Sequence, residues 1–212
     1  AVRRISEAIE KKKKRKALLV MATGTGKTRT VMALIDVFLR AHVAQKVLFL
    51  ADRDALVEQA ETDGFKRHLP SELRARIWSD STEEARRARV CVSTLQTLEQ
   101  CHTKFNPADF DLIVTDECHR SIYNKFTDVL AYFDAVQIGL TATPANLVDR
   151  DTFTFFDCND RVPTFNYPFS QAVEEEYLVN YDVYAAQTKF QRKGIKGVDL
   201  SEEDKESLRE RG

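Results

Sequence analysis

The chain has 212 residues, of which 43% are hydrophobic, and its formal net charge at pH 7 is −1. This length fits one domain with extensions, and the near-zero charge excludes a global positive field, so that any contact with nucleic acid must be local. No apolar stretch approaches the length needed to span a membrane, and the first residues lack a signal-peptide layout. We therefore expect a cytoplasmic protein without a membrane partner.

Apolar runs alternate with helical patterns through the middle of the chain. We expect strands at 17–22, 46–51, 89–93, 110–115 and 136–140, and helices at about 27–41, 54–66, 94–101 and 122–133. This alternation predicts an α/β fold with a mostly parallel sheet and helices on both faces. Ligands of such sheets bind beyond the carboxyl ends of the strands. The residues at or just past these ends are Lys27, Asp52, Thr94, Asp116 and Thr141.

The first motif is Met-Ala-Thr-Gly-Thr-Gly-Lys-Thr at 21–28, between an expected strand and an expected helix. This is the context of a phosphate-binding P-loop. Gly24 and Gly26 let backbone N–H groups turn toward phosphate oxygens, and the helix N-terminus adds partial positive charge. Lys27 supplies a charge for the β- and γ-phosphates, and Thr28 supplies a hydroxyl for Mg²⁺.

The second motif follows the apolar run 110–114 and reads Thr-Asp-Glu-Cys-His at 115–119. A carboxylate at the tip of a buried strand can hold Mg²⁺, as we expect of Asp116, and its neighbour Glu117 can orient the attacking water. Both motifs occur in this order and precede Leu-Thr-Ala-Thr-Pro at 140–144. Together they favour a nucleotide-hydrolysing domain over two ordinary turns.

The four cysteines form no C-x-x-C pair, and two of them, Cys91 and Cys118, stand in or beside apolar strands. This pattern predicts buried thiols in a reducing compartment and gives no support to a disulfide framework or a zinc site.

These motifs together resemble the first RecA-like P-loop domain of a superfamily 2 helicase motor. The string Asp-Glu-Cys-His-Arg-Ser at 116–121, with Leu-Ala-Asp-Arg at 50–53, looks like the motor (R) subunit of type I restriction-modification enzymes. The strings at 93–97, 139–144 and 167–173 are similar to the same family. The resemblance spans about residues 1–192, and we expect 193–212 to be a charged linker toward a missing second RecA-like domain.

The resemblance implies a role for each matching residue. Phosphates of ATP would be bound by Thr23, Gly24, Thr25, Gly26, Lys27 and Thr28. Mg²⁺ would be held by Thr28 and Asp116. The catalytic residues would be Lys27, Asp116, Glu117 and His119. Thr141 and Thr143 would relay the nucleotide state to the DNA-facing loops. The DNA backbone would be contacted, without reading of its sequence, by Arg53, Thr94 and Gln96.

The implied function is ATP-dependent translocation of double-stranded DNA in a prokaryotic cytoplasm, as part of a type I restriction endonuclease. The implied partners are the second RecA-like domain and the nuclease domain of the same subunit, with the modification and specificity subunits. The chain begins too late to show the adenine-reading Gln of relatives, and it lacks the arginine of the second motor domain. Such arginines contribute about 10³–10⁵ in rate. We therefore expect ATP binding with little turnover, and no cleavage of DNA.

Two other functions are compatible with part of this pattern. Another superfamily 2 enzyme, an RNA helicase or a DNA-repair translocase, would share the ATP chemistry. A non-catalytic nucleotide-gated binding module would be free to lose the catalytic residues, and the intact Lys27, Thr28, Asp116 and Glu117 argue against it.

Local alternatives also remain for four of the residues. Arg53 could pair with Asp54 or Glu58 at a helix N-terminus, and Asp52 could fix a loop. Thr141 and Thr143 could cap a turn before Pro144.

Two segments also have a structural interpretation. The basic run at 11–16 favours a solvated helix end over a DNA contact. The aromatic residues of 153–169 favour packing against the sheet over base stacking.

Overall fold

The computed structural model describes residues 1–118, 124–144, 146–147 and 150–181. The chain divides into two units, Ala1–Leu178 and Val179–Gly212, and the first unit contains both motifs. The expected linker at 193–212 lies outside the described residues. The account below concerns the first unit.

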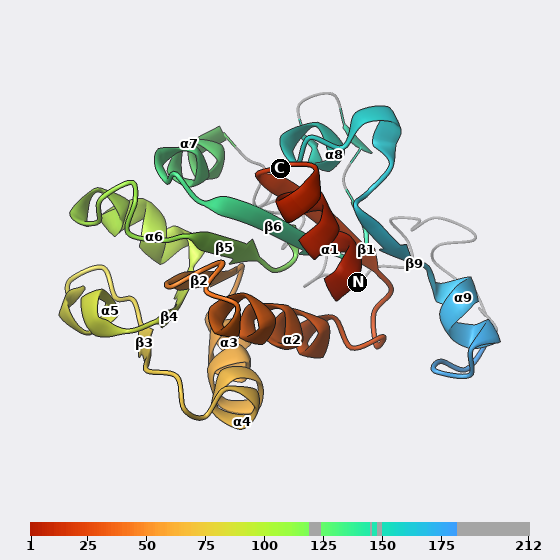
Figure 1. The fold of residues 1–212 in the computed structure, drawn as a ribbon, viewed down its shortest axis with the longest axis horizontal. Helices are drawn as coiled ribbons and strands as arrows, with labels where there is room; N and C mark the ends of the chain where they lie inside the picture. Colours follow the sequence, from red (N-terminus) through yellow and green to blue (C-terminus); the bar gives the residue numbers. More distant parts are fainter. Residues whose placement is uncertain (119–123, 145, 148–149, 182–212) are drawn as a thin grey trace, which may run out of the picture. The chain divides into compact units, whose positions relative to one another are not determined.

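The first unit is built on a seven-stranded sheet with the strand order β3-β4-β2-β5-β6-β1-β9 (Figure 1). Every pair of neighbouring strands is parallel. The strands are β1 Lys16–Met21, β2 Val47–Ala51, β3 Arg74–Arg76, β4 Val90–Thr94, β5 Leu112–Thr115, β6 Val136–Thr141 and β9 Phe165–Tyr167. The five predicted strands are confirmed with ends shifted by one or two residues, and the predicted α/β class is confirmed with them.

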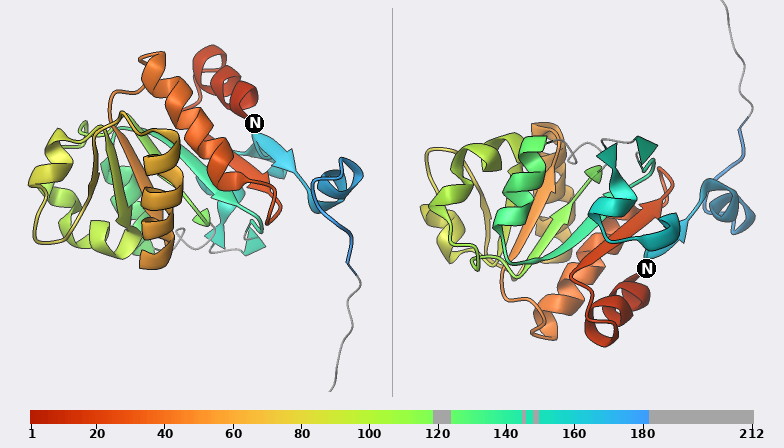
Figure 2. Two further views of the ribbon diagram at one scale, coloured as in Figure 1. Left: turned by 90° about the horizontal axis from the view of Figure 1, so that it is seen from below. Right: turned by 90° about the horizontal axis from the view of Figure 1, so that it is seen from above.

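Helices cover both faces of this sheet, as the alternation predicted (Figure 2). One face carries α1 Val2–Ser6, α2 Lys27–Arg40, α3 Asp54–Gln59 and α4 Lys66–His68, with π-helical turns at Glu7–Lys11 and Ala60–Phe65. The other face carries α5 Glu83–Arg87, α6 Leu95–Cys101 and α7 Asn124–Tyr132. The sheet is therefore the middle layer of three, and its strands are buried from both sides.

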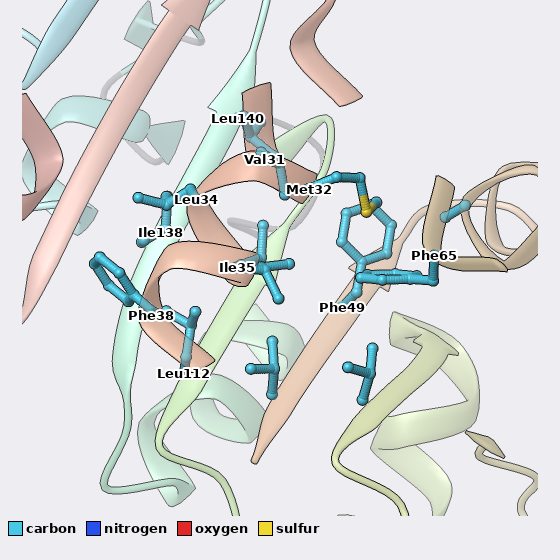
Figure 3. Packing of buried hydrophobic residues seen from close by; sticks show 14 of the residues in the cluster. Val31, Met32, Leu34, Ile35, Phe38, Phe49, Phe65, Leu112, Ile138 and Leu140 are labelled. Carbon is cyan, nitrogen blue, oxygen red and sulfur yellow. The ribbon is translucent and has the colours of Figure 1, made fainter. Parts of the chain in front are cut away.

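Helix α2 is held by an apolar stripe that faces the sheet. Val31, Leu34, Ile35 and Phe38 recur at helical spacing, and each is at most 2% exposed. They pack on side chains of the central strands, among them Ile138 (Figure 3). Each fully buried aliphatic side chain contributes about 1.5–3 kcal/mol. This packing fixes the first turn of α2 directly after the glycine-rich loop.

The helix predicted at 54–66 differs in detail, because its second half is the π-helical turn Ala60–Phe65. Gly64 in this turn approaches α2 so closely that an added Cβ would lie 2.9 Å from Met32 Cε. Several short elements have no counterpart in the sequence prediction: β3, α5, the strand pair β7 Asn146–Leu147 and β8 Arg150–Asp151, α8 Thr152–Phe155, β9 and α9 Phe169–Glu174. All of them lie at edges or in connections, where periodicity is weak.

The late aromatic segment packs against the sheet, which was the favoured interpretation of its sequence. Phe156 is 2% exposed and joins a small cluster with Leu18, Cys118 and Cys158. Gly139 on β6 is required there, because an added Cβ would clash with the ring of Phe156. The segment 152–158 therefore packs against β6, the strand that ends at Thr141.

All four cysteines are buried free thiols, as predicted for two of them. Burial raises the pKa of each, in the case of Cys91 to about 12. In the part of the chain that the structure describes, every helix is too short or too polar to cross a bilayer.

Candidate functional site

The predicted site residues gather at one edge of the sheet. Parallel pairing aligns the strands so that Val20 lies opposite Thr141, and Ala51 lies opposite Thr94. The loops that follow β1, β2, β4, β5 and β6 therefore leave from the same edge. His119 lies outside the described residues, so its predicted role stays a prediction.

The loop between β1 and α2 has the backbone geometry of an anion cradle. Gly24 and Gly26 have φ angles of +84° and +83°, in the left-handed region that glycine adopts without strain. The Thr25 hydroxyl and the Thr25 N–H both donate to the Ala22 carbonyl, at 2.6 and 3.3 Å, which closes a tight turn. The loop thus ends at the N-terminus of a 14-residue helix, where backbone N–H groups and the helix dipole favour an anion.

Lys27 is the first residue of α2, and its side chain is only 13% exposed. Its Nζ lies 3.5 Å from the Met21 carbonyl oxygen and 3.7 Å from Glu117 Oε1. A shielded ammonium group attracts anions more strongly than a solvated one, because the surrounding dielectric constant is lower. Thr23, Gly24 and Thr28 are exposed beside it. The arrangement fits a polyphosphate, with Lys27 beside the phosphates and Thr28 at the start of the helix.

Asp116 and Glu117 extend β5 toward the same place. The Asp116 N–H donates to the Leu50 carbonyl at 2.8 Å, and Asp116 Oδ1 accepts from the Glu117 N–H at 3.0 Å. Burial raises the pKa of Asp116, and the charge of Glu117 raises it further, against the opposing effects of that N–H and of Lys27. A carboxylate in such a place is stabilised by a further cation.

These residues fit Mg²⁺ rather than a metal held by protein alone. Mg²⁺ in phosphate-transferring sites is held by one or two protein oxygen ligands together with substrate phosphates and water. Asp116 and Thr28 can supply such oxygens. Among the described residues, no group of three or more His, Cys, Asp or Glu side chains could hold a metal ion.

Glu117 has a φ angle of +46°, which is rare for a residue other than glycine. A left-handed conformation costs such a residue about 1–2 kcal/mol. Strain of this kind is concentrated at functional sites, where the surrounding structure maintains it. Here it sets the direction in which Glu117 leaves β5, with Oε1 3.7 Å from Lys27 Nζ.

The predicted DNA-contact residues lie at the ends of β2 and β4, which we call the outer part of the edge. Arg53 is the N-cap of α3, pairs with Asp52 at 3.7 Å, and has a side chain that is 69% exposed. Thr94 caps α6, because its Oγ1 accepts from the Thr97 N–H at 3.1 Å, whereas Gln96 in the first turn is exposed. Arg53 and Gln96 are thus presented to solvent, and Thr94 is committed to a helix cap.

Thr141 is buried, and its Oγ1 accepts from the Thr143 N–H at 3.1 Å. This is the turn-capping role considered above; a coupling role stays a prediction. A pocket of about 480 Å³ is lined both by residues of the P-loop and β5 end and by residues that follow β2. Its lining residues are Thr23, Asp52, Arg53, Ala55, Leu56, Glu117, Ala142 and Thr143.

Two further residues join this edge without any signal from a motif. Leu178 packs beside the P-loop, since a Cβ added to Gly24 would lie 3.1 Å from Leu178 Cδ2. Trp78 follows β3 with the guanidinium of Arg76 over its ring, 4.2 Å from the centroid. The sequence does offer one hint for Trp78, because it is the only tryptophan of the chain.

Comparison with known proteins identifies the family. The family described as "Type III restriction enzyme, res subunit" matches residues 1–146, which is more than half of the chain. The chain belongs to this restriction-enzyme family. The endonuclease subunit of the type I restriction enzyme EcoAI from Escherichia coli is 31% identical over 189 residues, covering 86% of this chain and 23% of that subunit. The chain thus spans about a quarter of this curated relative.

Solved structures agree with the family and with the fold. A fragment from Vibrio vulnificus YJ016, assigned as an HsdR subunit of a type I restriction enzyme, is 27% identical with a TM-score of 0.59, covering 81% of this chain and 30% of that one. The SWI2/SNF2 ATPase core of Sulfolobus solfataricus, solved with double-stranded DNA, is 18% identical with a TM-score of 0.57, covering 68% of this chain and 32% of that one. The likeness to a superfamily 2 motor domain of type I R subunits is confirmed.

Proposed function

We propose that this member of the restriction-enzyme family is the first RecA-like domain of an ATP-driven motor that moves double-stranded DNA. The observation that carries the proposal is the convergence of three charged side chains beside a left-handed glycine loop. Lys27 lies within 3.7 Å of Glu117, and Asp116 stands one residue before it at the same edge of the sheet. Structural turns alone do not require two adjacent partly buried carboxylates and a lysine there.

ATP is the proposed substrate, and its phosphates would bind in the loop Thr23–Thr28. Backbone N–H groups of Gly24 and Gly26, together with Lys27, would balance the phosphate charge. Thr28 and Asp116 would hold Mg²⁺, which supplies charge neutralisation on the β- and γ-phosphate oxygens when it is bound. Burial and the charge of Glu117 raise the pKa of Asp116, which means that they disfavour its ionised form. A bound Mg²⁺ would offset this cost, which supports the proposed role.

Hydrolysis is proposed to be an in-line attack of water on the γ-phosphate. Glu117 would accept a hydrogen bond from this water and orient it, and Lys27 would stabilise charge on the phosphate oxygens. His119, Thr141 and Thr143 would couple the nucleotide state to the DNA-facing loops. Because the arginine of a second motor domain contributes about 10³–10⁵ in rate in comparable enzymes, this chain alone would turn over slowly.

Double-stranded DNA is the proposed track. Arg53 and Gln96 are exposed at the outer part of the edge, where contacts to phosphates would position the duplex without reading its sequence. Thr94, predicted as a third contact, is buried and caps α6, so it would support Gln96 rather than contact the DNA itself. The S. solfataricus core that shares this fold was solved with double-stranded DNA, which supports the choice of track. We further propose that residues 1–192 form the motor domain and 193–212 a linker to a second RecA-like domain. A nuclease domain of the same subunit and modification and specificity subunits would complete the enzyme in a bacterial cytoplasm.

Binding of a fluorescent ATP analogue with Mg²⁺ tests the proposal directly. We expect saturable binding to the chain and a loss of roughly 100-fold in affinity in Lys27→Ala, equivalent to about 2.7 kcal/mol. Lys12→Ala is the matched control, because Lys12 is exposed and precedes β1, whereas the loop follows the other end of that strand. Equal affinities of Lys27→Ala and the unmodified chain would reject the nucleotide site.

A further inference from the structure

Trp78 is exposed in an unusual way for its residue type. It lies two residues after the end of β3, and 51% of its surface is accessible to solvent. Tryptophan has the largest apolar side chain and is highly buried on average, so a half-exposed ring commonly marks a binding surface. No other tryptophan occurs in the sequence.

Trp78 leaves the sheet at the same edge as the nucleotide and DNA-contact residues. Arg76 pairs with Val92, and the Ile77 N–H donates to the Val92 carbonyl at 2.9 Å. Continuing this register by one more residue brings Trp78 to the level of Thr94, which itself pairs with Ala51 on β2. Because the strand order is β3-β4-β2, Trp78 lies one strand away from Thr94 on β4 and two strands away from β2, which Arg53 follows.

The indole ring is held in place by a charged neighbour. The Arg76 guanidinium lies 4.2 Å from the ring centroid and forms an ion pair of 2.5 Å with Asp54 at the start of α3. The side chain of Arg76 is only 19% exposed, so the stack is anchored to the fold rather than loose. A ring fixed before binding loses less conformational entropy when a partner arrives.

The ring is surrounded by charged side chains of both signs. Arg76 covers one side of the indole, and Lys104 reaches the Ser79 carbonyl beside it at 2.6 Å. On the neighbouring strand β2, Ala51 pairs with Thr94, and Arg53 follows Ala51 by two residues. The exposed carboxylate of Asp80 follows the ring, and Arg76 itself pairs with the exposed Asp54. A ring among charged side chains differs from a protein-binding patch, whose centre is depleted of charge.

We propose that Trp78 is a contact residue for the backbone of double-stranded DNA. Its indole would pack against the deoxyribose of one strand, and its Nε1–H would donate to a phosphate oxygen. In an intact duplex the bases are stacked on each other, so the ring would meet the sugar edge and not a base face. This inference rests on the proposed DNA-translocating function, because it assigns one more residue to the same track.

The single tryptophan supplies its own probe. We would titrate the 212-residue chain with a short DNA duplex at low salt and record intrinsic tryptophan emission, with the anisotropy of labelled duplex as a separate measure of binding. A saturable change in emission is expected at the same DNA concentrations as the rise in anisotropy. Trp78→Ala should lose about five- to tenfold in DNA affinity, the scale of one lost hydrogen bond. Trp78→Phe should lose less.

Three controls keep the outcomes distinct. Tyr177→Ala removes an aromatic residue that is 74% exposed and belongs to the segment after α9, and it should leave DNA affinity unchanged. Binding of the ATP analogue should be equal in Trp78→Ala and the unmodified chain, which also verifies folding. If Trp78→Ala binds no analogue, Trp78→Phe takes its place in the comparison.

Two results together would overturn the role of Trp78 alone and leave the motor proposal intact. The unmodified chain would bind DNA without a change in tryptophan emission, and the Trp78 variants would bind DNA with the affinity of the unmodified chain. Failure to bind duplex DNA while the ATP analogue still binds, or a preference for RNA, would overturn the DNA track and the role of Trp78 together.

Discussion

The inner and outer parts of the functional edge are built in opposite ways. At the inner part, after β1 and β5, the side chains of Lys27 and Glu117 are only 13% and 29% exposed. At the outer part, after β2, the Arg53 side chain is 69% exposed. The inner part thus concentrates charge where solvent is scarce, and the outer part presents charge to solvent.

This difference predicts different sensitivities. Shielded charges interact strongly and are weakly screened by salt, so each group at the inner part should be close to indispensable for its ligand. Exposed charges contribute about 0–1 kcal/mol each and are screened, so the outer part should respond to substitution by degrees. The experiments below test that contrast, in order of decreasing expected effect.

Asp116→Asn should give the largest effect on the inner part. Removing the carboxylate should lower ATP-analogue affinity in the presence of Mg²⁺ by roughly 10- to 100-fold, the scale reported for groups that support a bound metal. Affinity measured with a chelator present should change little, because the residue would act through the metal. Asp134→Asn, which alters an exposed aspartate paired with Arg15, is the matched control. An equal loss with and without Mg²⁺ would refute the metal role.

Gly24→Ala should have an intermediate effect, because the loop conformation itself would change. The φ angle of +84° and the 3.1 Å approach to Leu178 both oppose a Cβ at this position. We expect the free energy of unfolding to fall by about 1–2 kcal/mol, with weaker analogue binding. Gly26→Ala shares the left-handed φ, but its Cβ would meet nothing within 4 Å. Urea denaturation of both variants therefore isolates the contact with Leu178, and identical losses would show that the contact is immaterial.

Arg53→Ala should weaken the outer part only moderately. Loss of one phosphate contact should reduce affinity for duplex DNA by about three- to tenfold at low salt and lower the slope of log affinity against log salt by about 1. Binding of the ATP analogue should stay within twofold, which is roughly 0.4 kcal/mol. A salt series of anisotropy titrations measures both quantities. A variant with an unchanged salt slope would remove Arg53 from the track.

The smallest expected effect is on the stability of the ligand-free chain at neutral pH. Because folding raises the pKa of Asp116, the folded chain holds that proton more tightly than the unfolded chain does. Stability is then lost as the pH rises from the ordinary Asp value of about 3.9 through the folded pKa. Asp116→Asn lacks this loss and should melt roughly 1–3 °C higher at pH 7, the scale of a sub-kcal/mol to 1 kcal/mol change in a domain of this size. Thermal melts across pH should show the advantage disappearing below pH 4, and a constant advantage would contradict the assignment to Asp116.

The sequence alone predicted the centre of the fold well. The strands β1, β2, β4, β5 and β6 are continuous apolar runs, which is how strands covered on both faces read. Strand β3 escaped prediction because only Ala75 of its three residues is buried, between Arg74 and Arg76. An edge strand pairs on one side only, so its side chains carry little of the apolar signal.

The candidate site divides in the same manner. The P-loop and the Asp116–Glu117 pair could be predicted, because their chemistry is local to one turn each. Trp78 could not, because its relation to Thr94 and Arg53 depends on the order β3-β4-β2, which no single segment encodes. The contact of Leu178 with Gly24 joins residues more than 150 positions apart for the same reason.

The buried cysteines have a practical consequence for following the motion of such a motor. Thiol-labelling reagents attack the thiolate, and the raised pKa values of all four native thiols keep them protonated and inaccessible. A cysteine introduced on the surface, for instance at Lys12, would react far sooner than any native one. Fluorophore pairs for distance measurements can therefore be attached to this domain without first deleting the cysteines that help fill its interior.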